Sequence, residues 1–264
     1  MPTTVLNISG AGPILNKQLK EALLLPRHEH GWEIALKFLS FNNAIFNVVS
    51  QQTQGLAKNN LFYYSLDAGA TYEAPVEIPT GAYEIDSISD VIETELIKRT
   101  HTTAPDSGVS LITITGNAST LRSEISVSNT DIYVDFTKAN TIRKILGFNS
   151  AVLQGDLKFV SDTVANIKND IEAIRVRTNL VTDSYSTTSS GGDVNISSVI
   201  YSTIQQTPPG FYESREIASP IYLRTGLDYI KDINITLVNQ YDKVIPLSES
   251  EAVNYVFLIR KSKY

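Results

Sequence analysis

Hydrophobic and polar residues alternate with a period of two along much of this chain. The pattern is clear over residues 32–38, 132–136, 233–237 and 253–259. A strand that is buried on one face shows this period, because successive side chains point to opposite sides of the sheet. These four segments predict half-buried strands, and the Tyr-Asp-Lys sequence between the last two predicts a C-terminal β-hairpin.

Further candidate strands are short runs rich in β-branched and aromatic residues. They cover residues 45–49, 61–66, 72–78, 109–114, 125–127, 171–180 and 199–204. Clusters of Gly, Pro, Asn, Asp and Ser separate them, as turns do. About eight to ten short antiparallel strands indicate an all-β fold, a single jelly-roll sandwich, and not βαβ units.

Two helices interrupt the strands. Residues 85–96 place Ile85, Ile88, Ile92 and Leu96 on one stripe of a 3.6-residue period, which predicts an inserted amphipathic helix. Ser87 with Asp90 can cap its start, and Lys98 with Arg99 suits its C-terminal dipole. A second, short helix is predicted over residues 140–147, with Asn140 as N-cap and Gly147 as the stop.

No linker rich in Pro and Gly divides the 264 residues, and no fixed-period repeat is visible. We therefore expect a single domain over residues 1–264, with a possible flexible N-terminal segment at residues 1–12. This segment lacks a basic stretch followed by an apolar one, and nowhere does the chain approach 18 consecutive apolar residues. We expect a soluble intracellular product without a membrane span.

Composition narrows the function classes. The net charge of −6 provides no global positive field to attract nucleic acid or anionic lipid. The absence of cysteine excludes disulfides, thiolate metal sites and a Cys nucleophile. The chain has three histidines, His28, His30 and His101, too few and too dispersed to favour a metal site. We expect no cofactor, no metal and no catalytic residue.

Other polar groups have ordinary interpretations. Glu213 and Glu216 could serve a glycosidase, but a solvated strand face is the more common role for such a pair. Residues 184–198, rich in Ser, Thr and Gly, are typical of a flexible loop that could touch a partner. Two short segments carry positive charges: Arg175 and Arg177 in the first, and Arg260, Lys261 and Lys263 in the second. These charges could pair with carboxylates of a neighbouring subunit or with packaged nucleic acid.

The order of several short motifs resembles the penton proteins of polinton (Maverick) elements, adintoviruses and virophages. These are single jelly-roll minor capsid proteins, similar in role to the adenovirus penton base. The resemblance covers most of the chain. The residues that carry it are Pro79, Gly81 and Tyr83 before a helix; Leu146, Gly147 and Phe148; Arg175 to Leu180; and the two final strands through Arg260, with the opening segment 32–48.

The resemblance implies a structural virion protein and not an enzyme. Pentamers of it would occupy the five-fold vertices of an icosahedral capsid, among trimers of a double jelly-roll major capsid protein. The packaged genome or a vertex fibre would be possible further partners. The protein would be made in the host cytoplasm or virus factory, and its long helix would close or prop one end of the sandwich.

The N-terminus adds a candidate processing site. Ile8, Gly10, Ala11 and Gly12 resemble the pattern cut by the adenovirus-type maturation protease, with cleavage between Ala11 and Gly12. Two alternatives to a capsid protein stay open: a receptor- or carbohydrate-binding jelly-roll module, and an enzyme on a β-scaffold.

Overall fold

A computed structural model describes residues 3–27, 29–52, 56–104, 108–168, 171–181, 184–187, 194–204 and 206–262. Internal contacts divide the chain into two compact units. Unit 1 comprises Met1–Ile45 and Ile171–Tyr264, and unit 2 comprises Phe46–Asp170. This differs from the single domain expected over residues 1–264. Unit 2 is inserted within unit 1, and neither junction has a run of Pro or Gly residues that would mark the boundary in the sequence.

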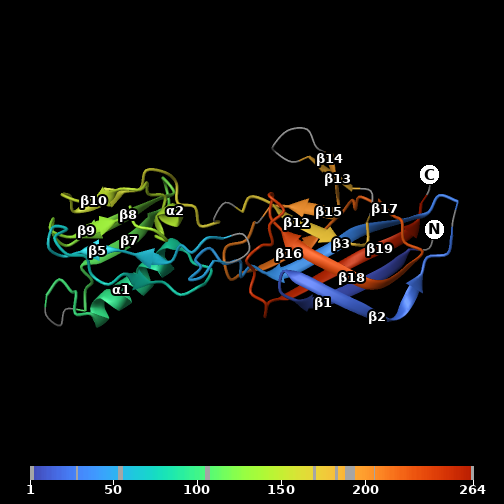
Figure 1. Ribbon diagram of the computed structural model, residues 1–264, viewed down its shortest axis with the longest axis horizontal. Coiled ribbons are helices and arrows are strands. Elements are labelled where there is room, and N and C mark those ends of the chain that lie inside the picture. The colour runs from blue at the N-terminus through green and yellow to red at the C-terminus, as the bar shows by residue number, and fades with distance from the viewer. Residues whose placement is uncertain are drawn as a thin grey trace. The chain divides into compact units, whose positions relative to one another are not determined.

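Unit 1 is a sandwich of two antiparallel sheets (Figure 1). The first sheet has the order β1-β19-β3-β16, with β17 also paired to β3. The second has the order β15-β12-β18-β2. Their strands are β1 Thr4–Ala11, β2 Ile14–Leu24, β3 Trp32–Asn42, β12 Ile174–Thr178, β15 Val199–Thr203, β16 Tyr212–Glu216, β17 Leu223–Thr225, β18 Tyr229–Val238 and β19 Ala252–Lys261. A separate pair joins β13 Ser184–Thr187 to β14 Val194–Ser197.

The strand order of unit 1 is that of a jelly roll. The chain passes from the first sheet to the second between β1 and β2, returns to the first sheet at β3, and alternates again through β16, β18 and β19. Two sheets connected in this manner form the double Greek key of the jelly-roll fold. The predicted jelly roll is therefore confirmed in unit 1.

The core of unit 1 follows from the period-two pattern. In β19 the alternate residues Val253, Tyr255, Phe257 and Ile259 are each at most 1% exposed. They pack against the inward side chains of the opposite sheet, among them Ile233 and Ile235. Burying alternate apolar side chains removes the apolar area from water, at roughly 25 cal/mol for each Å².

The two final strands do not form the predicted hairpin. β18 pairs with β12 and β2, whereas β19 pairs with β1 and β3 in the other sheet. A tight turn does follow β18, where the Asn239 amide donates to the Lys243 carbonyl over 2.8 Å. After this turn the chain crosses to the first sheet, because the apolar faces of both strands can be buried only against each other across the sandwich.

The expected flexible segment at residues 1–12 also differs from the structure. Residues Thr4–Ala11 form β1, which pairs in continuous antiparallel register with β19, from Thr4 opposite Ile259 to Ala11 opposite Ala252. Ile8 is buried in the core of unit 1. Leu6 and Ile8 are the apolar positions of a short period-two pattern, and this pattern is sufficient for an edge strand.

Unit 2 combines small sheets with two helices. The sheets have the orders β10-β9-β5, β11-β8-β7 and β4-β6. Its elements are β4 Leu61–Phe62, β5 Tyr64–Ser65, β6 Val76–Glu77, α1 Ile85–Lys98, β7 Ile112–Asn117, β8 Arg122–Val127, β9 Tyr133–Asp135, α2 Arg143–Leu146, β10 Val152–Leu153 and β11 Lys158–Val160. Both predicted helices are thus present, and both belong to the inserted unit.

Helix α1 buries the predicted stripe of Ile85, Ile88, Ile92 and Leu96 in the core of unit 2. The helix is part of the core of unit 2 and not of the core of unit 1, and the expectation that it closes or props one end of the jelly roll stays a prediction. Its N-cap is Glu84, without a side-chain cap bond, and not Ser87. Ser89 Oγ instead donates to Glu93 and accepts the Ile114 amide of β7 over 2.8 Å, which ties the helix to the sheet.

Helix α2 begins later than predicted. It covers Arg143–Leu146, after Ile142 as N-cap, and Asn140 stands outside it. Gly147 ends the helix as predicted, in the left-handed region with a φ of 80°. A Cβ at Gly147 would lie too close to the Thr163 carbonyl oxygen, so this position requires glycine for space as well as for conformation.

One buried side chain links both ends of unit 2. The Asn47 side-chain amide donates to the carbonyls of Tyr83 and Ile167, over 2.8 and 2.9 Å, and its oxygen accepts the Tyr83 amide over 2.9 Å. The side chain is almost fully buried. Replacing such a group would leave backbone groups unpaired, at a cost of about 1–3 kcal/mol.

We predict that residues 46–170, expressed alone, fold cooperatively. The reason is that unit 2 has its own hydrophobic core and that Asn47 ties its two ends together. A single thermal transition in circular dichroism, with dispersed amide resonances in NMR, would confirm it. The Asn47→Ala fragment should melt at a lower temperature, and Asn149→Ala, at an exposed position, is the control. A wild-type fragment with random-coil spectra would contradict the prediction.

Candidate functional site

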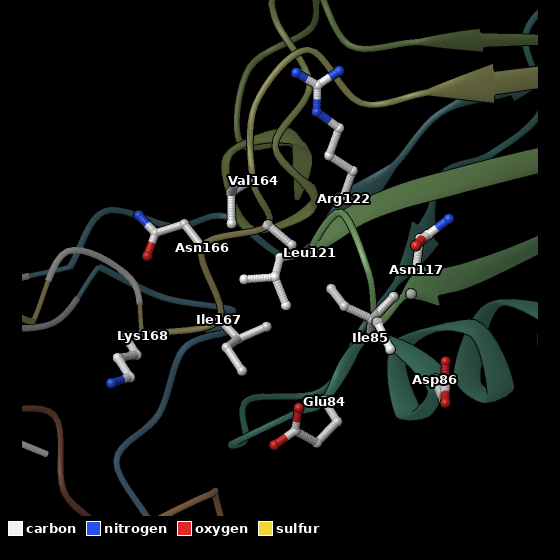
Figure 2. Close-up of a pocket in the computed structure, with 13 residues that line it drawn as sticks. Glu84, Ile85, Asp86, Asn117, Leu121, Arg122, Val164, Asn166, Ile167 and Lys168 are labelled. Carbon is white, nitrogen blue, oxygen red and sulfur yellow. The ribbon is translucent and has the colours of Figure 1, made fainter. Parts of the chain in front are cut away.

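An open groove of about 430 Å³ lies on unit 2 (Figure 2). Side chains of three segments meet there: the start of α1, the turn between β7 and β8, and residues 164–168. Figure 2 shows Ile85, Leu121 and Ile167 gathered at its centre, with Val164 above them. The groove is therefore lined mainly by apolar side chains, which suits it chemically to other apolar side chains.

Leu121 is unusual in both conformation and exposure. Its φ of 57° is in the left-handed region, and its side chain is 62% exposed at the groove. Two hydrogen bonds hold its backbone: its amide donates to the Asn117 carbonyl over 2.7 Å, and its carbonyl accepts the Ala165 amide over 2.9 Å. A bulky residue in this region carries strain of order 1 kcal/mol, and such strain often marks a functional surface.

Charged groups surround this apolar centre. Glu84 and Asp86 come from the start of α1, while Arg122 and Lys168 come from the other two segments. Beside the turn, Asn117 and Lys158 bond to the carboxylate of Glu124, and these bonds, with that of Lys158 the stronger, lower the pKa of Glu124. Glu124 thus stays ionised and holds the base of the β7–β8 turn in place.

The predicted processing site lies in a paired strand. Ile8, Gly10 and Ala11 belong to β1, and the Gly12 amide donates to the Glu251 carbonyl over 2.9 Å. Gly12 is buried and has a φ of 79°. A protease binds its substrate as an extended segment in its own cleft, so β1 would have to leave β19 before cleavage between Ala11 and Gly12.

The predicted basic residues bond within the chain. Arg260 Nε lies 2.9 Å from Glu33, with its guanidinium over the Tyr222 ring, and Arg175 lies 3.8 Å from Asp242. Arg177 donates to Ser198. Arg175 and Arg260 thus each have a carboxylate partner in their own unit, and pairing with a neighbouring subunit or with nucleic acid stays a prediction. Lys263 lies outside the described residues.

The two candidate glycosidase carboxylates do not converge. Glu213 is buried and is bound by Arg215 at 2.6 Å and by the Thr207 hydroxyl at 2.6 Å. Glu216 is exposed and pairs with Lys37 at 3.0 Å. Glu216 thus lies on a solvated strand face, as expected, whereas Glu213 is a buried structural partner of Arg215 and Thr207.

The histidines are separated between the units. His30 belongs to unit 1, while His101 in unit 2 bonds through Nδ1 to the Tyr64 hydroxyl over 2.9 Å. Arg99 also donates to this hydroxyl, and burial raises the pKa of Tyr64. In the part of the chain that the structure describes, no three His, Asp or Glu side chains converge as metal ligands would. His28 lies outside that part.

The remaining sequence predictions concern the Ser/Thr/Gly-rich segment and a membrane span. The Ser/Thr/Gly-rich segment was expected to be a loop, but its ends form the paired strands β13 and β14, and residues 188–193 lie outside the described residues. Among the helices that the structure describes, none is long and apolar enough to cross a membrane. The groove at Leu121 was not predicted, because no periodic pattern distinguishes an exposed Leu in a turn.

Comparisons with known proteins give structural likenesses. No protein-family model matches the sequence, and a search of curated proteins finds no match. The chain is similar to the selenomethionine-labelled mavirus penton protein, with 11% identity and a TM-score of 0.49, over 99% of this chain and 100% of that one. It is also similar to a chain in the 3.5 Å cryo-EM structure of the Sputnik virophage, with 14% identity and a TM-score of 0.47, over 99% of each chain. The jelly roll itself is established by the strand order of unit 1.

We predict that Leu121→Gly leaves the free energy of unfolding nearly unchanged. Glycine relieves the strain of the positive φ in the folded state. This gain offsets the loss of about 0.5–1 kcal/mol in the free energy of unfolding, which arises because glycine gives the unfolded chain more conformational freedom. Leu157→Gly is the matched control, because that side chain is similarly exposed and its φ is not positive. Urea unfolding should show Leu157→Gly to be the less stable by about 1 kcal/mol. Equal losses in both variants would contradict this.

We predict that the folded protein resists cleavage between Ala11 and Gly12. A free peptide covering residues 4–16 should be cut by an adenovirus-type maturation protease at least about tenfold faster than the folded chain, because pairing with β19 shields β1. Mass spectrometry of timed digests gives both rates. Rapid cleavage of the folded chain at this bond would instead show that β1 detaches readily.

Proposed function

We propose that this chain is a structural virion protein, a penton-type minor capsid subunit that forms pentamers at the five-fold vertices of an icosahedral capsid. The observation that carries the proposal is the jelly-roll strand order of unit 1, with a complete second unit inserted between β3 and β12. Jelly rolls are common in viral capsids, and also in lectins and cupins.

The motifs that resemble penton proteins support the capsid role, because they hold the fold together. Gly81 accepts the amides of Asn47 and Val48, and it packs so closely against Tyr83 that a Cβ would lie 2.7 Å from the ring. Gly147 ends α2 where no other residue fits. A protein whose motifs serve its framework suits a role in assembly better than one in chemistry.

The proposal extends to partners and place. The neighbours would be four further copies of the chain and the trimers of a double jelly-roll major capsid protein, with the capsid vertex as the location. The packaged genome or a vertex fibre would be additional partners. Processing at Ala11–Gly12 belongs to the same proposal, and it would act on chains in which β1 is not yet paired.

We predict ring-shaped assemblies with five-fold symmetry. Mass by light scattering over a concentration series should rise toward five copies, and negative-stain images of the same sample should show the rings. If the protein alone stays monomeric, the series is repeated with the major capsid protein of the same genome, which would template the vertex. A stable dimer or trimer, or a monomer that binds glycans and never joins shells, would favour the receptor- or carbohydrate-binding module.

A further inference from the structure

Exposed large hydrophobic side chains of unit 1 gather on the two edges of the sandwich. On the edge made by β1 and β2, here named edge 1, they are Val5, Ile14, Leu24 and the adjacent Tyr229, which pairs with Leu24. On the edge made by β15, β16 and β17, named edge 2, they are Ile204, Phe211, Tyr212 and Ile221. Tyr241, in the turn after β18, is the exception within the described residues of unit 1.

The two edges lie on opposite sides of the same sandwich. β1 and β2 are the last strands of their sheets on one side, joined directly through Gly12 and Pro13. β15 and β16 are the last strands on the other side. In Figure 1, β1 and β2 lie at the lower margin of unit 1, while β15 and β17 lie at its upper margin.

Single exposed hydrophobic residues are normal, but their concentration on edges is informative. The eight side chains are between 48% and 73% exposed. An edge strand also has unpaired backbone groups, and proteins that remain monomeric usually protect such edges with charge, proline or a covering segment. Here both edges carry exposed apolar side chains beside their charged residues, so charge alone does not cover them.

The two edges differ in the apolar and charged side chains that they offer. Edge 1 offers aliphatic side chains and the exposed Lys17 and Lys20, with Glu21 as its one acid on β2. Edge 2 offers the aromatic side chains of Phe211 and Tyr212, together with two exposed charged residues: Glu216, whose carboxylate pairs with Lys37, and Arg224 of β17. Two copies joined by edge 1 alone would oppose lysines to lysines, whereas edge 1 against edge 2 places the lysines against a surface of mixed charge.

The size of each edge fits a weak ring contact. The 11 residues of β2 span about 36 Å at about 3.3 Å per residue. Two sheets about 10 Å apart, with their side chains, make an edge roughly 20 Å wide. The resulting area of about 700 Å² is close to the about 800 Å² per partner of a standard interface. Assembly through it should therefore depend on concentration.

We propose that edge 1 of one copy packs against edge 2 of the next copy, with the same contact repeated around a closed ring. This inference rests on the proposed vertex function and names the surfaces that would build it. A contact between two different surfaces of the same chain adds subunits in one direction and closes when the rotation permits.

The rotation that relates one copy to the next in the ring also predicts which residues meet at the contact. With a ring axis along the strands, every residue keeps its height, so residues at the same end of the sandwich face each other across the contact. Leu24 and Ile221 lie toward the end that carries Trp32, as the pairings of Tyr229 with Leu24 and of Leu223 with Ile34 indicate. Phe211 lies at the end that carries Asn42.

The first test uses variants with one blocked edge. Val5→Asp/Leu24→Asp blocks edge 1, Phe211→Asp/Ile221→Asp blocks edge 2, and Tyr241→Asp is the control. Each blocked variant should be monomeric where the wild type assembles, alone or with the major capsid protein. Their equal mixture should stop at dimers, because one intact edge 1 meets one intact edge 2. Circular dichroism confirms that each variant is folded.

The second test uses cysteine cross-linking, which the cysteine-free sequence makes clean. Leu24→Cys/Ile221→Cys should give covalent chains longer than dimers under oxidation, at least about tenfold more than Leu24→Cys/Phe211→Cys, whose thiols lie at opposite ends. Each single-cysteine variant can reach only a dimer.

The outcomes separate the inference from the proposed function. The edge contact would be overturned if the wild type forms rings and the blocked variants still assemble. It would also be overturned if the wild type forms rings and the double-cysteine variant gives no cross-linked chains. In both cases the vertex function would stand. Dimers formed by one blocked variant alone would replace the head-to-tail contact by a two-fold one. A wild type that forms no ring and joins no shell would overturn both.

Discussion

The pairing of β19 between β1 and β3 is the interaction on which the rest of the structure depends. This last strand joins the first strand of the chain to β3, the strand that precedes the insertion. Its pairing with β3 runs from Val253 opposite Phe41 to Lys261 opposite Trp32, with one register shift after Val256. Until β19 is in place, β1 has no partner in its sheet among the described strands, and the inward side chains of β18 lack their opposite layer.

That dependence has a consequence for folding. The first sheet cannot close until the whole chain is available, and its contacts span residues on both sides of Phe46–Asp170. Contacts of large sequence separation form late, because the loop between them must be closed first. Unit 2 has mainly local pairings, such as β7 with β8, and its own core, so it can form while unit 1 waits for β19. The exposed edge strands of an incomplete unit 1 would be open to wrong partners during that interval.

Much of the fold could be predicted because strong periodicity has a single physical explanation. The alternation in residues 253–259 and the stripe from Ile85 to Leu96 both mark faces that the structure buries completely or nearly so. The sequence does not show which strands lie beside these faces. For this reason the pattern predicted, wrongly, that the last two strands pair with each other. Periodicity shows that a face is buried but not which strand lies beside it.

The missed strands β1 and β2 show a second limit. Residues Ile14–Leu24 are rich in Leu, Lys, Glu and Gln, which favour helices, yet they form the longest edge strand of the second sheet. Most of the side chains in this strand remain outside the core, so strict alternation is not required. Local propensity is weak compared with the hydrogen bonds that β18 offers along its whole length.

The position of the insertion explains how one chain can hold a second unit and still present two edges. Unit 2 leaves the sandwich after β3 and returns before β12, and both strands are internal to their sheets. It therefore adds no described strand to β1, β2, β15 or β16, and these four strands remain the last of their sheets. An insertion between β15 and β16 or between β1 and β2 would have interrupted an edge. The strand order of the jelly roll is thus complete without the inserted unit, which carries separate features such as the strained Leu121.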